Sequence, residues 1–438
     1  MKKFIFIFIF FLSHCSFDNK TGIWENSIKT VKNTNEYKDF KNLYTREKLF
    51  SKIINPTTNL KLNLKPIVSN KVWHDKYFNS SNNLSNYSYN NLNKLVFKSK
   101  KLTRYNINNG LLFDDDKIIT SDSKGNVIVY SIQNKKIILK FNFYKKKFKK
   151  KIKKLNIIFE KNIIYVGDNL GYLYALDLIQ EKILWAKNIK IPIRSNLKIV
   201  KDKILLADIN NSIYFINKSD GDSFKTIPTE EKKLKSNFIS SFAFNKNSIL
   251  YLNTNGSLYS LTHNGKINWF LSLNQSIDFN TNNLFYSNPI VINDNKIIVS
   301  TEPYLYVFNA INGFKELKLT ISSSVKPFIS GENLFLITKN NLLVCINVNN
   351  GKIIYSIDVI QKIADFLKTK KKSISINFAS IINNNLYLFL NNSYFVKFSP
   401  EGVLIDINKL PSRLNSYPMF VKNVIIYINK NNKLIIVN

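Results

Sequence analysis

Cys15 is the residue whose neighbours in the sequence best define a chemistry. Two lysines and an apolar run occupy residues 2–12, and Ser13, His14 and Cys15 follow them. The run is too short to span a bilayer as a mature helix, and basic, apolar and small residues before a cysteine are typical of a lipoprotein signal peptide. We therefore predict a signal peptide over residues 1–14 and lipid attachment at Cys15. His14 stands where a smaller residue is usual, so an export signal without lipidation is the alternative.

The other residue types that support catalysis or metal binding show no such arrangement. The second cysteine, Cys345, lies in an apolar segment and is predicted to be a small core residue. The three histidines have no metal-ligand spacing, and the acidic run 114–116 is interpreted as a turn. The sequence contains neither a nucleophile motif nor a phosphate-binding loop. It therefore predicts no catalytic residue, no metal site and no cofactor, in a protein that is not an enzyme.

The formal net charge is +35, which raises the question of nucleic-acid binding. Only four of the 64 basic residues are arginines, whereas base-reading and bidentate phosphate contacts favour arginine. The densest basic run, residues 145–154, contains apolar residues and is interpreted as a strand end followed by a solvated loop. We predict no nucleic-acid partner. An anionic membrane surface or an acidic partner stays open as the reason for the charge.

A repeated apolar segment defines the elements of the fold. Its eight copies begin at Gly125, Gly171, Asn211, Gly256, Pro303, Asn341, Ser393 and Asn432. An apolar run precedes each copy, another follows seven of them, and the spacing leaves room for one more strand. Four strands in about 40–50 residues are typical of a β-propeller blade. The sequence therefore predicts an all-β, eight-bladed propeller of four-stranded blades, preceded by a lipoprotein signal peptide and a flexible tether.

The ends of the repeats predict how blades pack and how the ring closes. Trp185, Trp269 and Tyr355 end the third strand of their units and are predicted to be wedges between blades. The last unit stops at the end of the chain without an outer strand, and the strand-like residues 93–102 could supply it. Residues 15–70 are predicted to be a polar tether and lead-in, and residues 71–438 the propeller.

The motif G-x-L-Y-A-L-D followed by G-K-x-x-W resembles the repeat of quinoprotein-type propellers, and residues 171–185 and 256–269 are its clearest copies. With the export signal, the eight units resemble the BamB family of outer-membrane assembly factors over about residues 70–438. The resemblance implies a non-enzymatic scaffold lipoprotein of the machinery that assembles outer-membrane β-barrels, lipid-anchored at the periplasmic face of the outer membrane. The implied partners are periplasmic domains of the barrel-forming subunit, with unfolded outer-membrane proteins as further clients.

The same resemblance implies which residues bind the partner. They are Leu234, Lys235 and Ser236 in one loop and Leu284 and Tyr286 in another. At the second loop the family carries acidic residues, and this chain departs from that pattern. Both connections, residues 230–241 and 274–287, mix apolar with polar residues as interfaces do. Capping of the core is the alternative role for their apolar side chains.

Two other classes of protein share this architecture. A quinoprotein-like periplasmic dehydrogenase would need clustered carboxylates for a cation beside its quinone, and the 29 acidic residues here are scattered. A free-standing periplasmic binding or sensor propeller is the other alternative, because a fold does not determine a function.

Overall fold

The computed structural model describes residues 15–17, 24–26, 50–144, 148–231, 237–273 and 285–438. The chain divides into two compact units, residues 1–48 and 49–438. In the first unit, the described strands β1 (Cys15–Phe17) and β2 (Trp24–Asn26) pair antiparallel. The predicted signal peptide lies outside the described residues. None of the helices in these ranges is long and apolar enough to cross a membrane.

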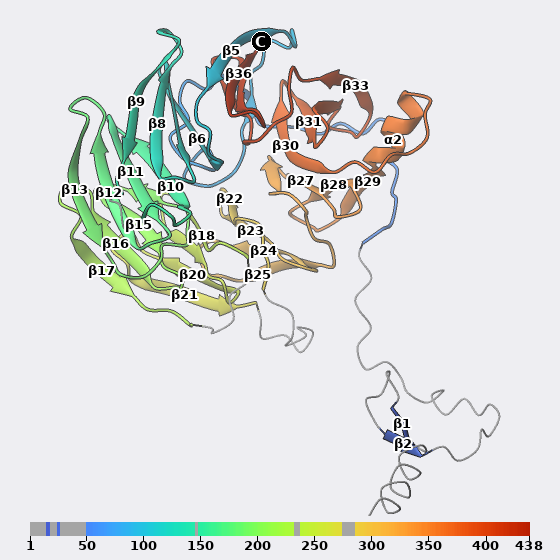
Figure 1. The fold of residues 1–438 in the computed structure, drawn as a ribbon. Coiled ribbons are helices and arrows are strands. Elements are labelled where there is room, and N and C mark those ends of the chain that lie inside the picture. The colour runs from blue at the N-terminus through green and yellow to red at the C-terminus, as the bar shows by residue number, and fades with distance from the viewer. Residues whose placement is uncertain (1–14, 18–23, 27–49, 145–147, 232–236, 274–284) are drawn as a thin grey trace, which may run out of the picture. The chain divides into compact units, whose positions relative to one another are not determined.

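The second unit is built of antiparallel sheets that follow one another around a common centre (Figure 1). Its described residues form eight sheets, each containing four antiparallel strands and one of them extended by two further strands, and we call these sheets blades 1 to 8 in chain order. This is the all-β architecture of four-stranded blades that the repeats predicted.

In blades 1 to 6 the strands run in chain order from the innermost to the outermost. Blade 1 contains β6 (Ile107–Asp114), β7 (Lys117–Asp122), β8 (Asn126–Ser131) and β9 (Lys136–Asn142). Blade 2 contains β10 (Leu155–Glu160), β11 (Ile163–Asp168), β12 (Tyr172–Asp177) and β13 (Lys182–Asn188). Blade 3 contains β14 (Lys198–Val200), β15 (Lys203–Ala207), β16 (Ile213–Asn217) and β17 (Ser223–Ile227). Blade 4 contains β18 (Ser241–Phe244), β19 (Ile249–Leu252), β20 (Ser257–Leu261) and β21 (Ile267–Ser272).

The second half of the ring repeats this order. Blade 5 contains β22 (Val291–Asn293), β23 (Lys296–Ser300), β24 (Leu305–Asn309) and β25 (Lys315–Leu319). Blade 6 contains β26 (Phe328–Ser330), β27 (Asn333–Ile337), β28 (Leu342–Asn347) and β29 (Ile353–Asp358), and helix α2 (Val359–Phe366) follows it. Blade 7 contains β30 (Ile376–Ile382), β31 (Asn385–Leu390), β32 (Tyr394–Phe398) and β33 (Leu404–Lys409), with β3 (Ile67–Val68) and β4 (Asn86–Tyr87) added at its inner edge. Blade 8 contains β34 (Met419–Val421), β35 (Val424–Ile428), β36 (Lys433–Val437) and β5 (Leu95–Lys101).

Burial differs between the inner and outer strands of a blade. All six residues of β8 are buried, whereas β9 alternates between exposed and half-buried residues. Neighbouring blades cover both faces of the inner strands, so these strands need no polar face. This explains why β12, with the sequence YLYALD, is apolar along most of its length.

The turn before the third strand is built in the same way in five blades. One carboxylate oxygen of Asp168 accepts hydrogen bonds from the N–H groups of Leu170 and Tyr172, at 2.9 and 2.8 Å. Equivalent contacts, two and four residues ahead, are made by Asp122, Asp208, Asn253 and Asn429. The residue that begins the repeat then has a positive φ, 89° at Gly171. Glycine and asparagine tolerate this conformation, which explains why they begin most of the repeats.

Trp185 and Trp269 lie within the outermost strands β13 and β21 and pack against the next blade. A Cβ atom on Gly221 of blade 3 would lie 2.5 Å from the Trp185 ring, so only glycine fits under this indole. The indole N–H of Trp185 donates to the Lys218 carbonyl at 2.8 Å. Trp269 lies against Gly313 of blade 5 in the same way. The predicted role of these side chains as wedges between blades is confirmed.

Blade 8 is closed by a strand from the beginning of the second unit. β5 pairs antiparallel with β36, and it lies within residues 93–102, where the sequence analysis placed the outer strand. Lys94 and Asn438 also exchange two backbone hydrogen bonds, at 3.1 and 3.0 Å. The pairing leaves neither β36 nor the ring with an open edge at this point.

Residues 50–70 belong to the second unit, which differs from the predicted tether over residues 15–70. Ile54 and Ser356 exchange backbone hydrogen bonds at 2.9 and 2.8 Å, and Phe50 packs on the apolar core of blades 5 and 6. The few apolar residues in this polar stretch therefore bind it to the propeller. They were too widely spaced to form a pattern of their own.

Candidate functional site

Residues 73–90, which we call the channel segment, lie along the inner strands of the ring. Their contacts follow the order of the blades. Trp73 bonds to Phe113 of blade 1, His74 to Phe159 of blade 2, Asp75 to Lys198 of blade 3, Ser80 to Phe244 of blade 4, Ser81 to Ile292 of blade 5, Asn83 to Ile329 of blade 6, Asn86 to Asn384 of blade 7 and Asn90 to Asn423 of blade 8. The segment thus makes one circuit of the channel and pairs polar groups that the innermost strands would otherwise leave open.

Aromatic side chains fix the channel segment in place. The Trp73 ring lies 4.8 Å from Phe78 and 5.7 Å from Tyr87, measured between ring centroids. Tyr87 stacks on Phe420 of blade 8 at 5.2 Å and is fully buried. These contacts join the segment to the largest apolar cluster of the protein. The segment is therefore part of the core.

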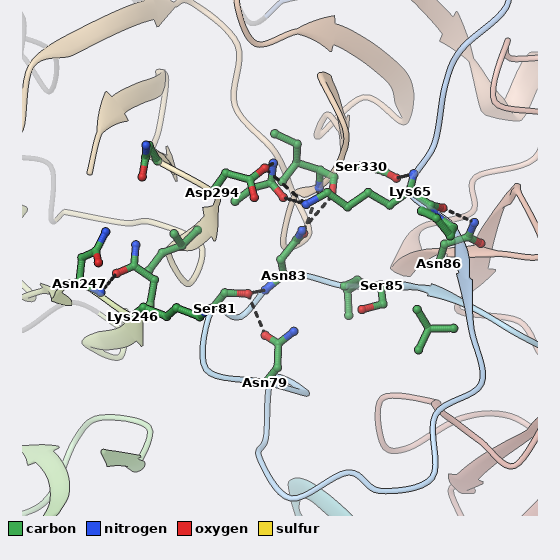
Figure 2. Close-up of a pocket in the computed structure, with 18 residues that line it drawn as sticks. Lys65, Asn79, Ser81, Asn83, Ser85, Asn86, Lys246, Asn247, Asp294 and Ser330 are labelled. Atoms are coloured by element: carbon green, nitrogen blue, oxygen red, sulfur yellow. Dashed lines mark hydrogen bonds and ion pairs between the residues drawn. The ribbon is translucent and has the colours of Figure 1, made fainter. Parts of the chain in front are cut away.

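A cavity of about 630 Å³, which we call the asparagine cavity, lies at one end of the channel (Figure 2). The turns that follow the innermost strands of blades 4 and 5 line it. Lys65 donates to the side chain of Asn293 at 2.7 Å and lies 3.4 Å from the carboxylate of Asp294. Asn83 exchanges two hydrogen bonds with the backbone of Ile329, at 2.8 and 3.1 Å. These side chains are bonded within the protein. They attach the chain at Lys65 and Asn83 to blades 5 and 6 and do not point freely into the cavity.

A second cavity, of about 310 Å³, is lined by residues that precede the innermost strands of blades 4 to 6 and 8, and we call it the tyrosine cavity. The innermost strands run in the same direction along the channel, so this cavity lies at the opposite end from the asparagine cavity. Its lining includes Lys76, Tyr77, Tyr286, Lys326 and Tyr417. Leu84 of the channel segment borders both cavities, which the segment therefore separates.

A buried ion pair lies beside the tyrosine cavity. The carboxylate of Asp75 accepts from the Lys198 ammonium at 2.7 Å and from the backbone N–H of Tyr77 at 2.8 Å. Lys198 is almost completely buried and also donates to the Asn79 carbonyl at 2.7 Å. Such a pair compensates the cost of removing both charges from water only while its geometry is kept. Asp75 thus has both oxygens engaged within the protein.

Lys326 lies close to this pair without a carboxylate of its own. Its ammonium donates to the backbone carbonyl of Asn82 and lies 5.9 Å from the centre of the Tyr77 ring. Desolvation lowers the pKa of Lys326 to about 7, and repulsion from the Lys198 charge contributes to this shift. Attraction to Asp75 acts in the opposite direction. Desolvation also lowers the pKa of Lys76. Both lysines are partly accessible from the cavity.

Of the five predicted partner-binding residues, Tyr286 is the one that lies within the described residues. Leu234, Lys235, Ser236 and Leu284 lie outside the described residues. Tyr286 lines the tyrosine cavity and is 44% exposed. Two apolar neighbours in the same connections, Phe238 and Phe285, are buried, and their rings meet edge to face at 5.6 Å. For these two side chains, the alternative role of capping the core is therefore correct.

Cys345, His74 and Asp116 were considered for chemistry in the sequence, and each is buried or bonded within the propeller. Cys345 is completely buried in β28, and desolvation raises the pKa of its thiol well above the usual range. His74 lies 2.7 Å from the carboxylate of Asp114, and Asp116 accepts from Ser131 at 2.6 Å. Both contacts are made within the propeller. Cys15 is the first residue of β1, and the structure does not describe its side chain.

The donor set of the channel does not suit a cation-dependent quinone. Hard cations need several oxygen ligands, usually carboxylates. No group of three or more His, Cys, Asp or Glu side chains that could hold a metal ion occurs among the described residues. The described lining of the tyrosine cavity contains no carboxylate, and Asp75 is already bonded to Lys198.

The family comparison concerns the middle of the propeller. Residues 144–356 match the family model described as outer membrane protein assembly factor BamB. The resemblance to the BamB family is thus confirmed. The matched range extends from the end of blade 1 into blade 6, and it contains the two connections with the predicted partner-binding residues. A search of curated proteins found no significant match to the chain.

Solved structures confirm the fold. BamB from Moraxella catarrhalis superposes with a TM-score of 0.61 and 13% identity, covering 79% of this chain and 99% of that chain. The quinohemoprotein alcohol dehydrogenase from Comamonas testosteroni has a TM-score of 0.59 and 10% identity, covering 84% of this chain and 80% of that chain. At these identities the likeness concerns the fold alone, which enzymes and non-enzymes share.

Sequence reasoning missed the channel segment. Its residues are mostly asparagine, serine and tyrosine, without apolar periodicity, so they were included in the propeller range 71–438 without a predicted element or role. Asn82 and Asn83 satisfy backbone groups of three blades, and Tyr87 is fully buried. A possible signal was the cluster of aromatic residues within 73–89, because isolated tethers rarely hold so many large side chains.

Proposed function

We propose that the protein is a non-enzymatic scaffold lipoprotein of the outer-membrane β-barrel assembly machinery. In this role Cys15 carries the lipid that holds the protein at the periplasmic face of the outer membrane. The propeller then binds a periplasmic domain of the barrel-forming subunit. The match of residues 144–356 to the BamB family supports the proposal most strongly.

The end of the channel with the tyrosine cavity is the proposed binding face. Tyr286 and Tyr417 are 44% and 47% exposed at its border, and Ile239 is 39% exposed. Exposed aromatic side chains beside a concave surface are typical of protein interfaces. The loops on this face are carried by a rigid ring, which suits reversible binding without chemistry.

Co-purification from detergent-solubilised membranes tests the proposal against both alternatives. We expect the tagged protein to recover the barrel-forming subunit. Recovery of electron-transfer proteins together with a quinone absorbance would instead indicate a dehydrogenase. Recovery of neither would favour a free-standing binding propeller, and either of these two results would refute the scaffold.

The anchor is tested separately by mass spectrometry of the mature protein. A lipid-modified Cys15 at the N-terminus is the expected result, because the apolar run and the cysteine form a lipoprotein signal. A mature terminus beyond Cys15, or an intact Met1, would contradict the lipid anchor.

A further inference from the structure

We propose that the tyrosine cavity binds a carboxylate group carried by a partner polypeptide. The inference rests on the proposed function only in naming a polypeptide as the carrier. The site is formed by Lys76 and Lys326, with the phenol groups of Tyr77, Tyr286 and Tyr417 around them.

The first step is the balance of charge at the cavity. Lys76, Lys198 and Lys326 supply three ammonium groups, and Asp75 supplies one carboxylate. That carboxylate is bonded to Lys198 at 2.7 Å. Within the described residues, no carboxylate lies at ion-pair distance from Lys76 or Lys326, and none lines the cavity. Two ammonium groups therefore face the cavity without an anionic partner, and partly desolvated charges of this kind favour a counter-ion.

The second step is the direction in which these groups can be reached. The cavity is bordered by Tyr286 and Tyr417, which are exposed, while Trp73 and Phe238 in its lining are buried. An entering group would thus meet aromatic rings at the border and ammonium groups deeper inside. An acidic side chain with apolar neighbours on its own chain matches this order. A volume of about 310 Å³ has room for one or two side chains.

The third step is the protonation of Lys326. Its pKa of about 7 is set by desolvation, by the Lys198 charge and, in the opposite direction, by Asp75. Lys76, Tyr77, Tyr286 and Tyr417 are the other titratable groups that line the cavity, and the Asp75–Lys198 pair lies beside it. A bound carboxylate would raise the pKa of Lys326, so binding should take up a proton near neutral pH. Affinity is then expected to fall as the pH rises above about 7.

The test is calorimetric titration of the purified full chain with three probes. One is a Gly/Ser decapeptide with a central Leu-Glu-Phe, the second has glutamine in place of the glutamate, and the third is phenylacetate. We expect the acidic peptide to bind and the glutamine peptide to bind about tenfold more weakly. Binding of phenylacetate as well would show that a small carboxylate is sufficient, and its absence would show that the peptide is needed.

Substitutions locate the site. Lys76→Met and Lys326→Met should each weaken binding of the acidic peptide about tenfold, and Lys326→Met should also remove the pH dependence. The matched control is Lys246→Met, since Lys246 lines the asparagine cavity at the other end of the channel. Both cavity variants remove an unpaired charge, so folding should persist, and circular dichroism checks this.

Three results would overturn the carboxylate site. They are equal binding of the two peptides, unchanged binding by both cavity variants, and tighter binding by Asp278→Asn. The last would mean that a carboxylate of the chain itself, outside the described residues, competes for the site. Because the assay needs no assembly machinery, it can fail while the barrel-forming subunit still co-purifies, and the two proposals are thereby distinguished.

Discussion

At the scale of single residues, the most consequential feature is the buried ion pair beside the channel. Asp75 and Lys198 come from the channel segment and from blade 3, and their ion pair is buried on both sides. A buried ion pair adds little stability over an apolar pair, but removal of one partner leaves a charge without compensation. The ion pair therefore fixes the position of the channel segment relative to blade 3.

Asp75→Ala should lower the free energy of unfolding by about 3–5 kcal/mol, because Lys198 would remain buried without its carboxylate. Urea denaturation followed by circular dichroism measures this. The matched control is Asp222→Ala, which removes an exposed partner of Lys187 and should cost at most about 1 kcal/mol. Equal costs for the two variants would contradict the structural role of the buried pair.

Lys326 predicts a pH dependence of stability. Its pKa is about 7 in the folded protein and about 10.5 in the unfolded chain, so the unfolded chain binds more protons between these values. The free energy of unfolding should therefore gain a contribution that rises with pH across this window. In Lys326→Met that contribution should be absent, and the variant should be more stable than the wild type at pH 7. A difference between the two proteins that does not change with pH would rule this out.

At the scale of elements, the channel segment has the role of a central core. Trp73 packs against Tyr87, and Tyr87 stacks on Phe420 of blade 8. The Tyr87 hydroxyl has no hydrogen-bond partner among the described residues, so its ring is the part that contributes packing.

Substitutions at these two positions separate packing from polarity. Trp73→Ala should cost about 3–5 kcal/mol through the cavity that it leaves. Tyr87→Phe should change stability by less than about 1 kcal/mol, or increase it, since it removes a buried unpaired hydroxyl. Thermal and urea unfolding measure both. A large loss for Tyr87→Phe would show that the hydroxyl is bonded.

Truncation from the N-terminus tests how much the channel segment and β5 contribute to stability. The sequence analysis began the propeller at residue 71, but the packing of residues 50–90 makes these residues part of the folded unit as well. Removal of residues 1–49 should leave the melting temperature nearly unchanged. Removal of residues 1–90 should lower it, because the channel segment is lost, and removal of residues 1–104 should lower it further, because β36 loses β5. Equal melting temperatures after removal of residues 1–49 and 1–90 would contradict this account of the core.

At the scale of the whole molecule, the repeated parts of the propeller could be predicted and the unrepeated parts could not. The eight repeats predicted the blades because a buried strand and a turn leave the same residues each time, as Asp168 and Gly171 illustrate. The wedge residues Trp185 and Trp269 were recognised from their place in the repeat. The pattern of a single repeat is weak, but its recurrence in eight units supports the assignment of every blade.

The channel and its cavities arise where chain segments without a pattern meet. Lys326, Tyr417 and Tyr77 come from blade 6, blade 8 and the channel segment, and no spacing in the sequence shows that they converge. Of the predicted partner residues, Tyr286 lies at this convergence. Its neighbours Phe238 and Phe285 turned inward because apolar rings beside a core gain more from burial than from exposure.

The central claim, that the protein acts as a scaffold through the tyrosine-cavity end of its channel, is tested most directly by quantitative co-purification with matched variants. The face variant is Tyr286→Ala with Tyr417→Ala, and the control is Lys246→Ala with Asn247→Ala at the opposite end. We predict that the wild type and the control recover the barrel-forming subunit equally. The face variant, folded by circular dichroism, should recover at least about tenfold less, as expected when aromatic anchors are removed. Equal recovery by all three proteins, or none by the wild type, would contradict the claim.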